Sequence, residues 1–309
     1  MGGGEVYATI VVYDGPYACS AAVLGSVLRR LDAKRRRVAL IYNVSAETVA
    51  MLTADQIWEV HQMPHPFVLP QSALWSRRPP LWGFQAQLWS LPFRRVLFFD
   101  ADHMPLPDTP PARLLQLWDH HAGLQSLAAI LEGTPQHGCF NSGLMMLRPR
   151  LSMLHEIGRE ATQLQVNTTR MSPSTSLRLL RERCPTGWNL DQPLLNAVFR
   201  PGHWTQLTAW RAATPYSVSD ICNVSVETEA APHMDSFHFM HPVRPWEQSS
   251  RCALFGAGCG AATNTAGVPD CHLWGTVSTM WWTNFLQLPS ATRKACQMRL
   301  PSTSTVRTI

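Results

Sequence analysis

Two carboxylates, Asp100 and Asp102, directly follow an apolar run in the segment VLFFDADHMPL at residues 96–106. We expect both to lie on the turn just past a buried strand, where they repel each other unless a cation intervenes. Carboxylate oxygens suit Mg²⁺ and Mn²⁺, which leave coordination positions open for phosphate oxygens. The segment therefore predicts a divalent-metal site, and a solvated turn without function is the alternative interpretation.

Imidazole and guanidinium groups gather in a second segment, HFMHPVRPW at residues 238–246. The imidazole of His238 is a reasonable third ligand for Mn²⁺ beside two carboxylates. Arg244 has the fork geometry to grip a phosphate through two hydrogen bonds. In the alternative interpretation, His238 and His241 are ordinary core or surface groups.

Polar side chains also occur in two further segments. FNSG at residues 140–143 offers the Asn141 amide, the Ser142 hydroxyl and accessible backbone where a loop meets a strand. LDQ at residues 190–192 places Asp191 and Gln192 at the start of a helix. Each segment has a plain alternative, an ordinary turn for the first and a helix N-cap for the second.

The elements around these segments alternate between strand and helix. Residues 6–13 predict a buried strand, residues 18–33 have apolar side chains at helical spacing, and residues 37–43 predict a second strand. This order favours a right-handed βαβ unit and a parallel sheet. Residues 94–102 predict another strand, whose last residues are the two aspartates. The carboxylates therefore lie at the carboxyl end of the strand, where open α/β sheets bind ligands.

The remaining patterns complete the chain without an internal repeat. They predict a loop at 64–83, a helix at 83–91, a strand at 138–149, helices at 150–165, 175–184 and 189–199, alternation at 235–246, a loop at 247–275 and a helix at 277–288. We expect Pro193 to break or kink the helix at 189–199. We expect a catalytic domain over 1–250, followed over 251–309 by a cysteine-containing loop, a closing helix packed on that domain and a disordered tail.

The charge balance is mildly basic, with 26 Lys and Arg against 21 Asp and Glu and a net charge of +5. Only Lys34 and Lys294 are lysines, so side-chain cations that bind anions are mostly Arg. The run KRRR at 34–37 has no interleaved aromatic residues, which favours a solvated loop over a nucleic-acid patch. No nucleic-acid partner is expected.

No stretch of the chain approaches the roughly 20 consecutive apolar residues of a membrane helix, and no secretory signal is visible at its start. We expect no membrane span and favour the cytoplasm, with a Golgi or secretory lumen as the alternative if the chain is a fragment of a longer one. Eight cysteines are too few for a disulfide scaffold at this length. Buried thiols are favoured, and disulfides are the alternative.

The order of these motifs resembles glycosyltransferase family 8 and, within it, the glycogenin-like branch. The resemblance spans residues 5–288 and rests on YACSAAVLGSVLRR, VLFFDADHMPL, CFNSGLMMLRP, DQPLLNAVF, HFMHPVRPW and MWWTNF. It implies an α/β fold of GT-A type, Rossmann-like, with a mixed, mostly parallel central sheet. It also implies retaining transfer of a hexose, glucose first, from a UDP-sugar to a hydroxyl acceptor on a carbohydrate or protein, with Mn²⁺ as cofactor and Mg²⁺ as the alternative. A homodimer is a further expectation.

The resemblance also implies a role for each matching residue. Asp100, Asp102 and His238 would ligate the metal, and Asp191 and Gln192 would lie beside the reacting centre. The residues implied to contact the donor are Tyr17 at uracil, Arg78 and Arg244 at the diphosphate, His241 where the backbone approaches phosphate, Asn141 and Ser142 at the sugar, and Ala101 and Gly143 as further substrate-binding residues. Retention would follow either from Asp191 as a nucleophile or from attack by the acceptor on the leaving-group side, and we favour the second route.

Several positions depart from the family's pattern. Gln85 stands where the family has a lysine, His241 where it has a glycine, and Trp188 where it has an aspartate. Val12 and Tyr13 replace polar residues at the end of the first strand. The alternative function is therefore a catalytically reduced protein that binds a nucleotide sugar or a glycan on a transferase scaffold.

Overall fold

The computed structural model describes residues 4–63, 83–106, 109–132, 138–170, 191–208, 210–213, 234–239 and 280–298 of the 309-residue chain. The predictions that lie outside the described residues are most of the loop at 64–83, the helix at 175–184, the loop at 247–275, and the roles of Arg78, Trp188, His241 and Arg244. In the described part of the chain, no helix is both long enough and apolar enough to cross a bilayer.

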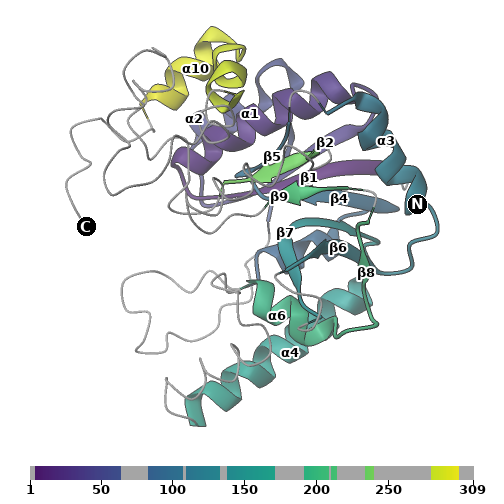
Figure 1. The fold of residues 1–309 in the computed structure, drawn as a ribbon. Helices are drawn as coiled ribbons and strands as arrows, with labels where there is room; N and C mark the ends of the chain where they lie inside the picture. The colour runs from purple at the N-terminus through teal and green to yellow at the C-terminus, as the bar shows by residue number, and fades with distance from the viewer. Residues whose placement is uncertain are drawn as a thin grey trace, which may run out of the picture. The chain divides into compact units, whose positions relative to one another are not determined.

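A seven-stranded sheet has the strand order β3-β2-β1-β4-β7-β6-β8 (Figure 1). Its strands are β1 (Glu5–Val12), β2 (Arg36–Tyr42), β3 (Glu59–Gln62), β4 (Arg95–Phe99), β6 (Leu127–Leu131), β7 (Phe140–Leu147) and β8 (Thr205–Gln206). β1 pairs with β4 in parallel, as β6 does with β8, whereas β7 runs antiparallel to both of its neighbours. The predicted α/β class with a mixed, mostly parallel sheet is confirmed.

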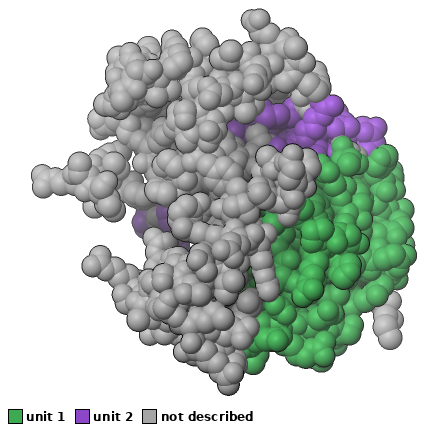
Figure 2. Space-filling model, turned by 60° about the horizontal axis from the view of Figure 1, so that its bottom comes forward, with its two compact units in different colours: residues 1–10, 61–99, 117–209 green, residues 11–60, 100–116, 210–309 purple. Residues whose placement is uncertain are grey.

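The chain forms two compact units, shown in green and purple in Figure 2. Unit 1 comprises residues 1–10, 61–99 and 117–209, and unit 2 comprises residues 11–60, 100–116 and 210–309. Each unit is thus assembled from segments far apart in the sequence. The predicted domain boundary after residue 250 lies outside the described residues and stays a prediction.

The core of unit 1 forms around β4 and β7, in which every residue is buried. Residues 96–99 of β4 and 144–147 of β7 are apolar, as expected of strands that are covered on both faces. The helices α4 (Leu151–Arg170) and α6 (Asp191–Val198) and the 3₁₀ helix η3 (Gln85–Ser90) pack against one another. Trp89 of η3 stacks on Phe199, which directly follows α6, with ring centroids 5.3 Å apart.

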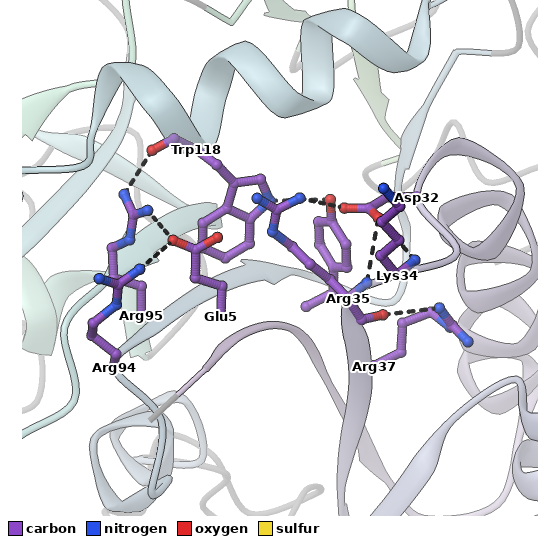
Figure 3. Close-up of polar contacts among 9 residues, drawn as sticks. Glu5, Asp32, Lys34, Arg35, Arg37, Arg94, Arg95 and Trp118 are labelled. Atoms are coloured by element: carbon purple, nitrogen blue, oxygen red, sulfur yellow. Dashed lines mark hydrogen bonds and ion pairs between the residues drawn. The ribbon is translucent and has the colours of Figure 1, made fainter. Parts of the chain in front are cut away.

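A buried arginine anchors β4 within unit 1 (Figure 3). Arg95 donates to the carbonyl of Trp118 at 2.6 Å and forms an ion pair with Glu5 of β1. Arg94 reaches the same carboxylate at 2.9 Å, and Trp118 Nε1 donates to the hydroxyl of Tyr7 at 3.0 Å. Trp118 belongs to α3 (Pro111–His120), so these bonds tie two strands and a helix end together. Arg95 and Trp118 are buried, whereas Arg94 reaches the carboxylate from the exposed side.

Helices form the core of unit 2. α1 (Pro16–Leu31) packs against α2 (Ala46–Thr53) and α10 (Ser290–Gln297) (Figure 1). Residues 280–286 are helical, in agreement with the predicted closing helix, and Trp281 Nε1 donates to Ser20 Oγ at 3.2 Å. Gly25 permits a close approach, because a Cβ at this position would lie 2.4 Å from Trp58 Nε1. That indole donates to the carbonyl of Ala21 at 2.7 Å.

The basic run at 34–37 leads into β2 of unit 2: Lys34 and Arg35 lie in the loop before the strand, with Lys34 exposed as predicted, whereas Arg36 and Arg37 belong to the strand. Arg35 pairs with Asp32 at 2.7 Å (Figure 3), and Arg36, which begins β2, pairs with Glu59 at 2.6 Å. Arg37 donates to three backbone carbonyls. The guanidinium groups are therefore engaged with protein acceptors, which the sequence pattern alone does not reveal.

Two predicted helices differ in form from the expectation. The helix at 83–91 is the 3₁₀ helix η3, which ends before Pro92 and in which the N–H of Leu91 bonds the carbonyl of Leu88 at 3.3 Å. Pro193 neither breaks nor kinks its helix, because α6 begins at Asp191. Proline in the first helical turn removes an N–H that has no intrahelical partner.

The described cysteines are of two kinds. Cys19 and Cys296 are buried free thiols, and Cys296 Sγ lies 3.3 Å from Met51 Sδ. Cys139 is disulfide-bonded. The preference for thiols is thus confirmed at Cys19 and Cys296 and is wrong at Cys139.

Candidate active site

Three side chains with metal-ligand atoms converge in unit 2. His238 Nε2 lies 3.2 Å from Asp102 Oδ1 and 3.7 Å from Asp100 Oδ2. One ligand atom from each of the three residues lies within 4.8 Å of the others. The structure thus brings together the two carboxylates and the imidazole that the sequence analysis assigns to one site.

A tight turn presents the two carboxylates. β4 ends at Phe99, and Asp100, Ala101 and Asp102 lie on the turn that follows it, as the sequence predicts. The N–H of His103 donates to the carbonyl of Asp100 at 2.9 Å and closes this turn. Ala101 is buried, with 5% of its surface exposed.

A small sheet of unit 2 brings the imidazole to this turn. Its strands are β5 (His103–Pro105), β10 (Ser236–His238) and β9 (Ala212–Ala213), in the order β5-β10-β9. β5 and β10 pair antiparallel, with His238 directly opposite His103. The N–H of Phe239 donates to the carbonyl of Asp102 at 2.7 Å. The ligand histidine is therefore held beside the carboxylates by backbone pairing.

The donor atoms and their spacing fit a small divalent cation. In octahedral coordination with bonds of about 2.1 Å, neighbouring ligand atoms lie about 3 Å apart. The two separations from His238 Nε2, 3.2 and 3.7 Å, are of this size. Carboxylate and imidazole ligands together suit Mn²⁺. The Asp100 side chain is 19% exposed, against 10% for Asp102 and 6% for His238, so solvent reaches the cluster at Asp100.

A buried carboxylate anchors the segment that enters β10. Asp235 is 3% exposed and accepts two hydrogen bonds from the guanidinium of Arg113, at 3.0 and 2.7 Å. It also accepts the backbone N–H of Arg211 at 3.0 Å. The hydrogen bond to Asp235 raises the pKa of Arg113 above its ordinary value, against the opposing effect of desolvation. Arg113 thus stays charged, and its two hydrogen bonds to Asp235 hold the start of β10.

In unit 1, the side chains of α6 bind the backbone of β7. β4 ends opposite Leu144, so residues 140–143 extend beyond its last pair. Gln192 Oε1 accepts the N–H of Ser142 at 3.0 Å. Asn196 Oδ1 accepts the N–H of Phe140, and its amide donates to the carbonyl of the same residue, both at 2.9 Å. Two amides of α6 therefore satisfy backbone groups that β4 does not reach.

The amide of Asn141 has protein partners at both ends. Its nitrogen donates to Glu132 Oε2 at 2.6 Å, and its oxygen accepts the N–H of Gly143 at 2.8 Å. Asn141 and Ser142 are 2% and 1% exposed. Glu132, which the sequence analysis did not single out, is 1% exposed. This network fixes the backbone at the start of β7.

The two residues expected at the reacting centre begin α6. Asp191 is half-buried, and its Oδ1 accepts the N–H of Gly83 at 2.5 Å. Gly83 has φ +86°, a conformation that glycine adopts without strain. Gln85 is 4% exposed and donates to the carbonyl of Ser142 at 3.4 Å, so a neutral amide occupies this buried position.

The uracil-contact candidate lies in unit 2, where Tyr17 is half-buried in the first turn of α1. Tyr13, which directly follows β1, has φ +63°, and its ring meets Tyr42 edge-on at 6.2 Å between centroids. The uracil contact of Tyr17 stays a prediction. The implied donor contacts outside the described residues are Arg78, His241 and Arg244.

No family model matches the sequence, and no curated protein matches it. Solved structures do resemble the fold. The galactosyltransferase LgtC, in complex with donor and acceptor sugar analogues, has a TM-score of 0.55 at 15% identity, over 94% of this chain and 99% of that chain. The apo-form glycosyltransferase GlyE of Streptococcus pneumoniae TIGR4 has a TM-score of 0.51 at 13% identity, over 91% of this chain and 61% of that chain. The fold is that of a GT-A nucleotide-sugar transferase.

Three residues that hydrogen-bond to the candidate site residues or to their strands in this GT-A fold were not predicted from the sequence. Asn196 stands four residues after Gln192, which places both amides on one face of α6 and is a usable signal. Glu132 has no local signal, because its partner Asn141 becomes its neighbour through the pairing of β6 with β7. Asp235 likewise meets Arg113, 122 residues away, through tertiary structure alone.

Proposed function

We propose that this protein is a metal-dependent, retaining hexosyltransferase of the family 8, glycogenin-like type, with a UDP-sugar as donor. The observation that carries the proposal is the convergence of three metal-ligand side chains in a GT-A fold. Asp100 and Asp102 directly follow the central strand β4, and His238 of β10 lies beside them. A site of this kind suits a nucleoside diphosphate, whose negative charge a bound cation neutralises. The acceptor is a hydroxyl of a carbohydrate or a protein, and glucose is the first sugar to test.

The cation is Mn²⁺ in this proposal, and Asp100, Asp102 and His238 would hold it. When bound, it supplies Lewis-acid stabilisation of the charge that develops on the departing UDP. Arg244 and Arg78 would add charge-assisted hydrogen bonds to the phosphate oxygens. Tyr17 would pack on the uracil, and the remaining donor contacts would come from Ala101, His241, Asn141, Ser142 and Gly143.

Gln192 is suited to orient the sugar. Its Oε1 faces the N–H of Ser142, because that donor requires an acceptor, so the amide nitrogen forms the opposite end of the side chain. Within the described residues, this nitrogen makes no hydrogen bond to protein. An amide held at one end by the backbone presents two N–H groups in a fixed direction. We assign it a hydrogen bond to the donor sugar.

Asp191 orients the sugar beside Gln192 in the route that we favour. The acceptor attacks from the leaving-group side, and an oxygen of the departing UDP takes the acceptor's proton. In the other route, the Asp191 carboxylate attacks the anomeric carbon and forms a covalent glycosyl intermediate. The hydrogen bond from Gly83 favours the first route, because it stabilises the carboxylate anion and lowers its nucleophilicity.

The experiment that tests the proposal is a donor screen. UDP release is measured with Mn²⁺ and UDP-glucose, UDP-galactose, UDP-glucuronate or UDP-N-acetylglucosamine, with an EDTA-treated sample as the control. We expect release with at least one donor, its loss with EDTA, and an α-configured product by NMR. Mass spectrometry of the protein after the reaction distinguishes self-modification from transfer to another acceptor or to water. Failure of all donors with Mn²⁺ present would refute the proposal.

A catalytically reduced binding protein is the second candidate, and Gln85 is the observation that favours it. The family's lysine is replaced by a buried neutral amide bonded to Ser142, so one cation is absent from this position. Calorimetry with UDP and Mn²⁺ separates the two candidates. Binding of UDP without even slow hydrolysis of any UDP-sugar would favour the binding protein.

A further inference from the structure

The ring of the ligand His238 lies against a second imidazole. The ring centroids of His103 and His238 are 4.9 Å apart, and their planes differ by 22°. His103 is fully buried and stands directly opposite His238 in the antiparallel pair of β5 and β10. Side chains opposite each other in such a pair are close neighbours. The face of His103 therefore restricts how the His238 ring can rotate.

Hydrogen bonds restrict His103 in turn. Its Nε2 lies 2.8 Å from Ser236 Oγ, and Trp210 Nε1 donates to the same oxygen at 2.8 Å. Ser236 is fully buried, and Trp210 is 3% exposed. The direction of the hydrogen bond between His103 Nε2 and Ser236 Oγ depends on the tautomer of His103, because a neutral imidazole nitrogen either accepts or donates. In either direction, the bond holds the His103 ring beside a buried hydroxyl that Trp210 holds from its other side.

The strand geometry explains how one short element supplies both the ligand and this support. Ser236 and His238 are two residues apart on β10, so their side chains lie on the same face. His103 meets this face from β5 and contacts both of them. The series Trp210–Ser236–His103–His238 therefore links the buried side of the small sheet to the ligand ring.

We propose that His103 is a positioning residue of the metal site. Its ring packs against the ring of His238 and keeps His238 Nε2 oriented toward Asp100 and Asp102. The inference rests on the metal site of the proposed function and is independent of which sugar is transferred. Partners that orient a metal-binding histidine change metal affinity or activity by about 10–100-fold when they are removed.

The test is a titration of the whole chain with Mn²⁺ in the absence of nucleotide. The electron paramagnetic resonance signal of free Mn²⁺ serves as the readout. We expect His103→Ala to raise the Kd for Mn²⁺ by about 10-fold and Ser236→Ala to raise it by a smaller factor. His103→Phe keeps a flat ring against His238 and should stay within about threefold of the unmodified protein. His121→Ala, which removes a buried imidazole from unit 1, is the matched control and should leave the Kd unchanged.

Thermal unfolding of each variant shows whether a weaker Kd for Mn²⁺ results from the loss of the ring beside His238 or from unfolding of the protein. If His103→Ala does not fold, the comparison of Ser236→Ala with His103→Phe retains the test, because both preserve the bulk of the small sheet. Unchanged Mn²⁺ affinity in His103→Ala, or equal weakening in His103→Phe and His103→Ala, would overturn the inference and leave the proposed function standing. No Mn²⁺ binding by the unmodified protein would overturn the inference, and the metal assignment of the proposed function with it.

Discussion

The backbone N–H of Phe239 donates to the carbonyl of Asp102 at 2.7 Å, so the strand that carries the ligand histidine is bonded to the turn that carries the ligand carboxylates. β5 and β10 are each three residues long. Such short strands contribute few ladder bonds of their own, and their alignment depends on what holds their ends. In β10 that support comes from Asp235, which directly precedes the strand.

Removal of the Asp235 carboxylate should weaken the fold around the metal ligands. Asp235→Ala leaves the Arg113 guanidinium and the N–H of Arg211 without their buried acceptor. We expect a loss of about 2–3 kcal/mol in the free energy of unfolding, measured by urea denaturation. A double-mutant cycle with Arg113→Ala isolates the interaction between the two side chains. A coupling energy near zero would contradict the anchoring role.

Replacement of Gln192 should impair turnover more than folding. In Gln192→Glu, a carboxylate oxygen still accepts the N–H of Ser142, but the free amide donor is lost and a negative charge is added. We expect kcat for UDP release to fall by about 10²-fold, with a smaller change in KM for the donor. The control is Gln125→Glu, the same chemical change at an exposed site in unit 1. A kcat equal to that of the control would argue against the sugar contact.

The buried imidazole of His121 should make stability depend on pH. Desolvation, followed by the neighbouring charges of His120 and Arg95, lowers the pKa of His121 below its ordinary value of 6.5. The unfolded chain therefore takes up a proton near pH 6.5 that the folded protein resists, and stability is lost as the pH falls from there toward the lowered pKa. In His121→Gln, the unfolding free energy should fall less steeply below pH 6.5.

His155→Gln is the control for this pH dependence, because His155 is an exposed histidine of α4 and is not among the groups that lower the pKa of His121. The control should keep the steep fall in stability of the unmodified protein. Urea denaturation at a series of pH values provides the measurement. Equal pH dependence in His121→Gln and the unmodified protein would show that another group is responsible.

The main strands and the carboxylate turn were predictable because they depend on local patterns. The apolar run before Asp100 indicates a buried strand, and the change to two carboxylates marks its end. His238 is different, because its place beside Asp102 results from the pairing of β10 with the distant strand β5, in which His238 lies opposite His103. No periodicity signals such a partner: its residue type made His238 a candidate ligand, and the family resemblance assigned it to the metal site.

Several elements were not predicted: the helices α2, α3 and α10, the strands β3 and β6, and the very short strands β5, β8 and β9. β5, β8 and β9 have only two or three residues, too few for an alternation to be read. η3 was predicted as a helix, but its N–H groups bond carbonyls three residues earlier, as Leu91 does with Leu88, which composition does not reveal. The hydrogen bond between Gln192 and Ser142 forms because the last residue of β4, Phe99, pairs with Leu144, so β4 does not extend along residues 140–143 of β7. Only the assembled sheet reveals this difference in strand length.

The most direct test of the metal-centred account is Mn²⁺-dependent UDP release by Asp102→Asn, compared with Asp119→Asn, the same change at an exposed position of α3. Asparagine keeps the size of the side chain but removes the charge that a divalent ligand set requires. We expect Asp102→Asn to lose about 10²-fold or more of the activity while retaining its thermal transition, and Asp119→Asn to match the unmodified protein. Full Mn²⁺-dependent activity in Asp102→Asn would contradict the account.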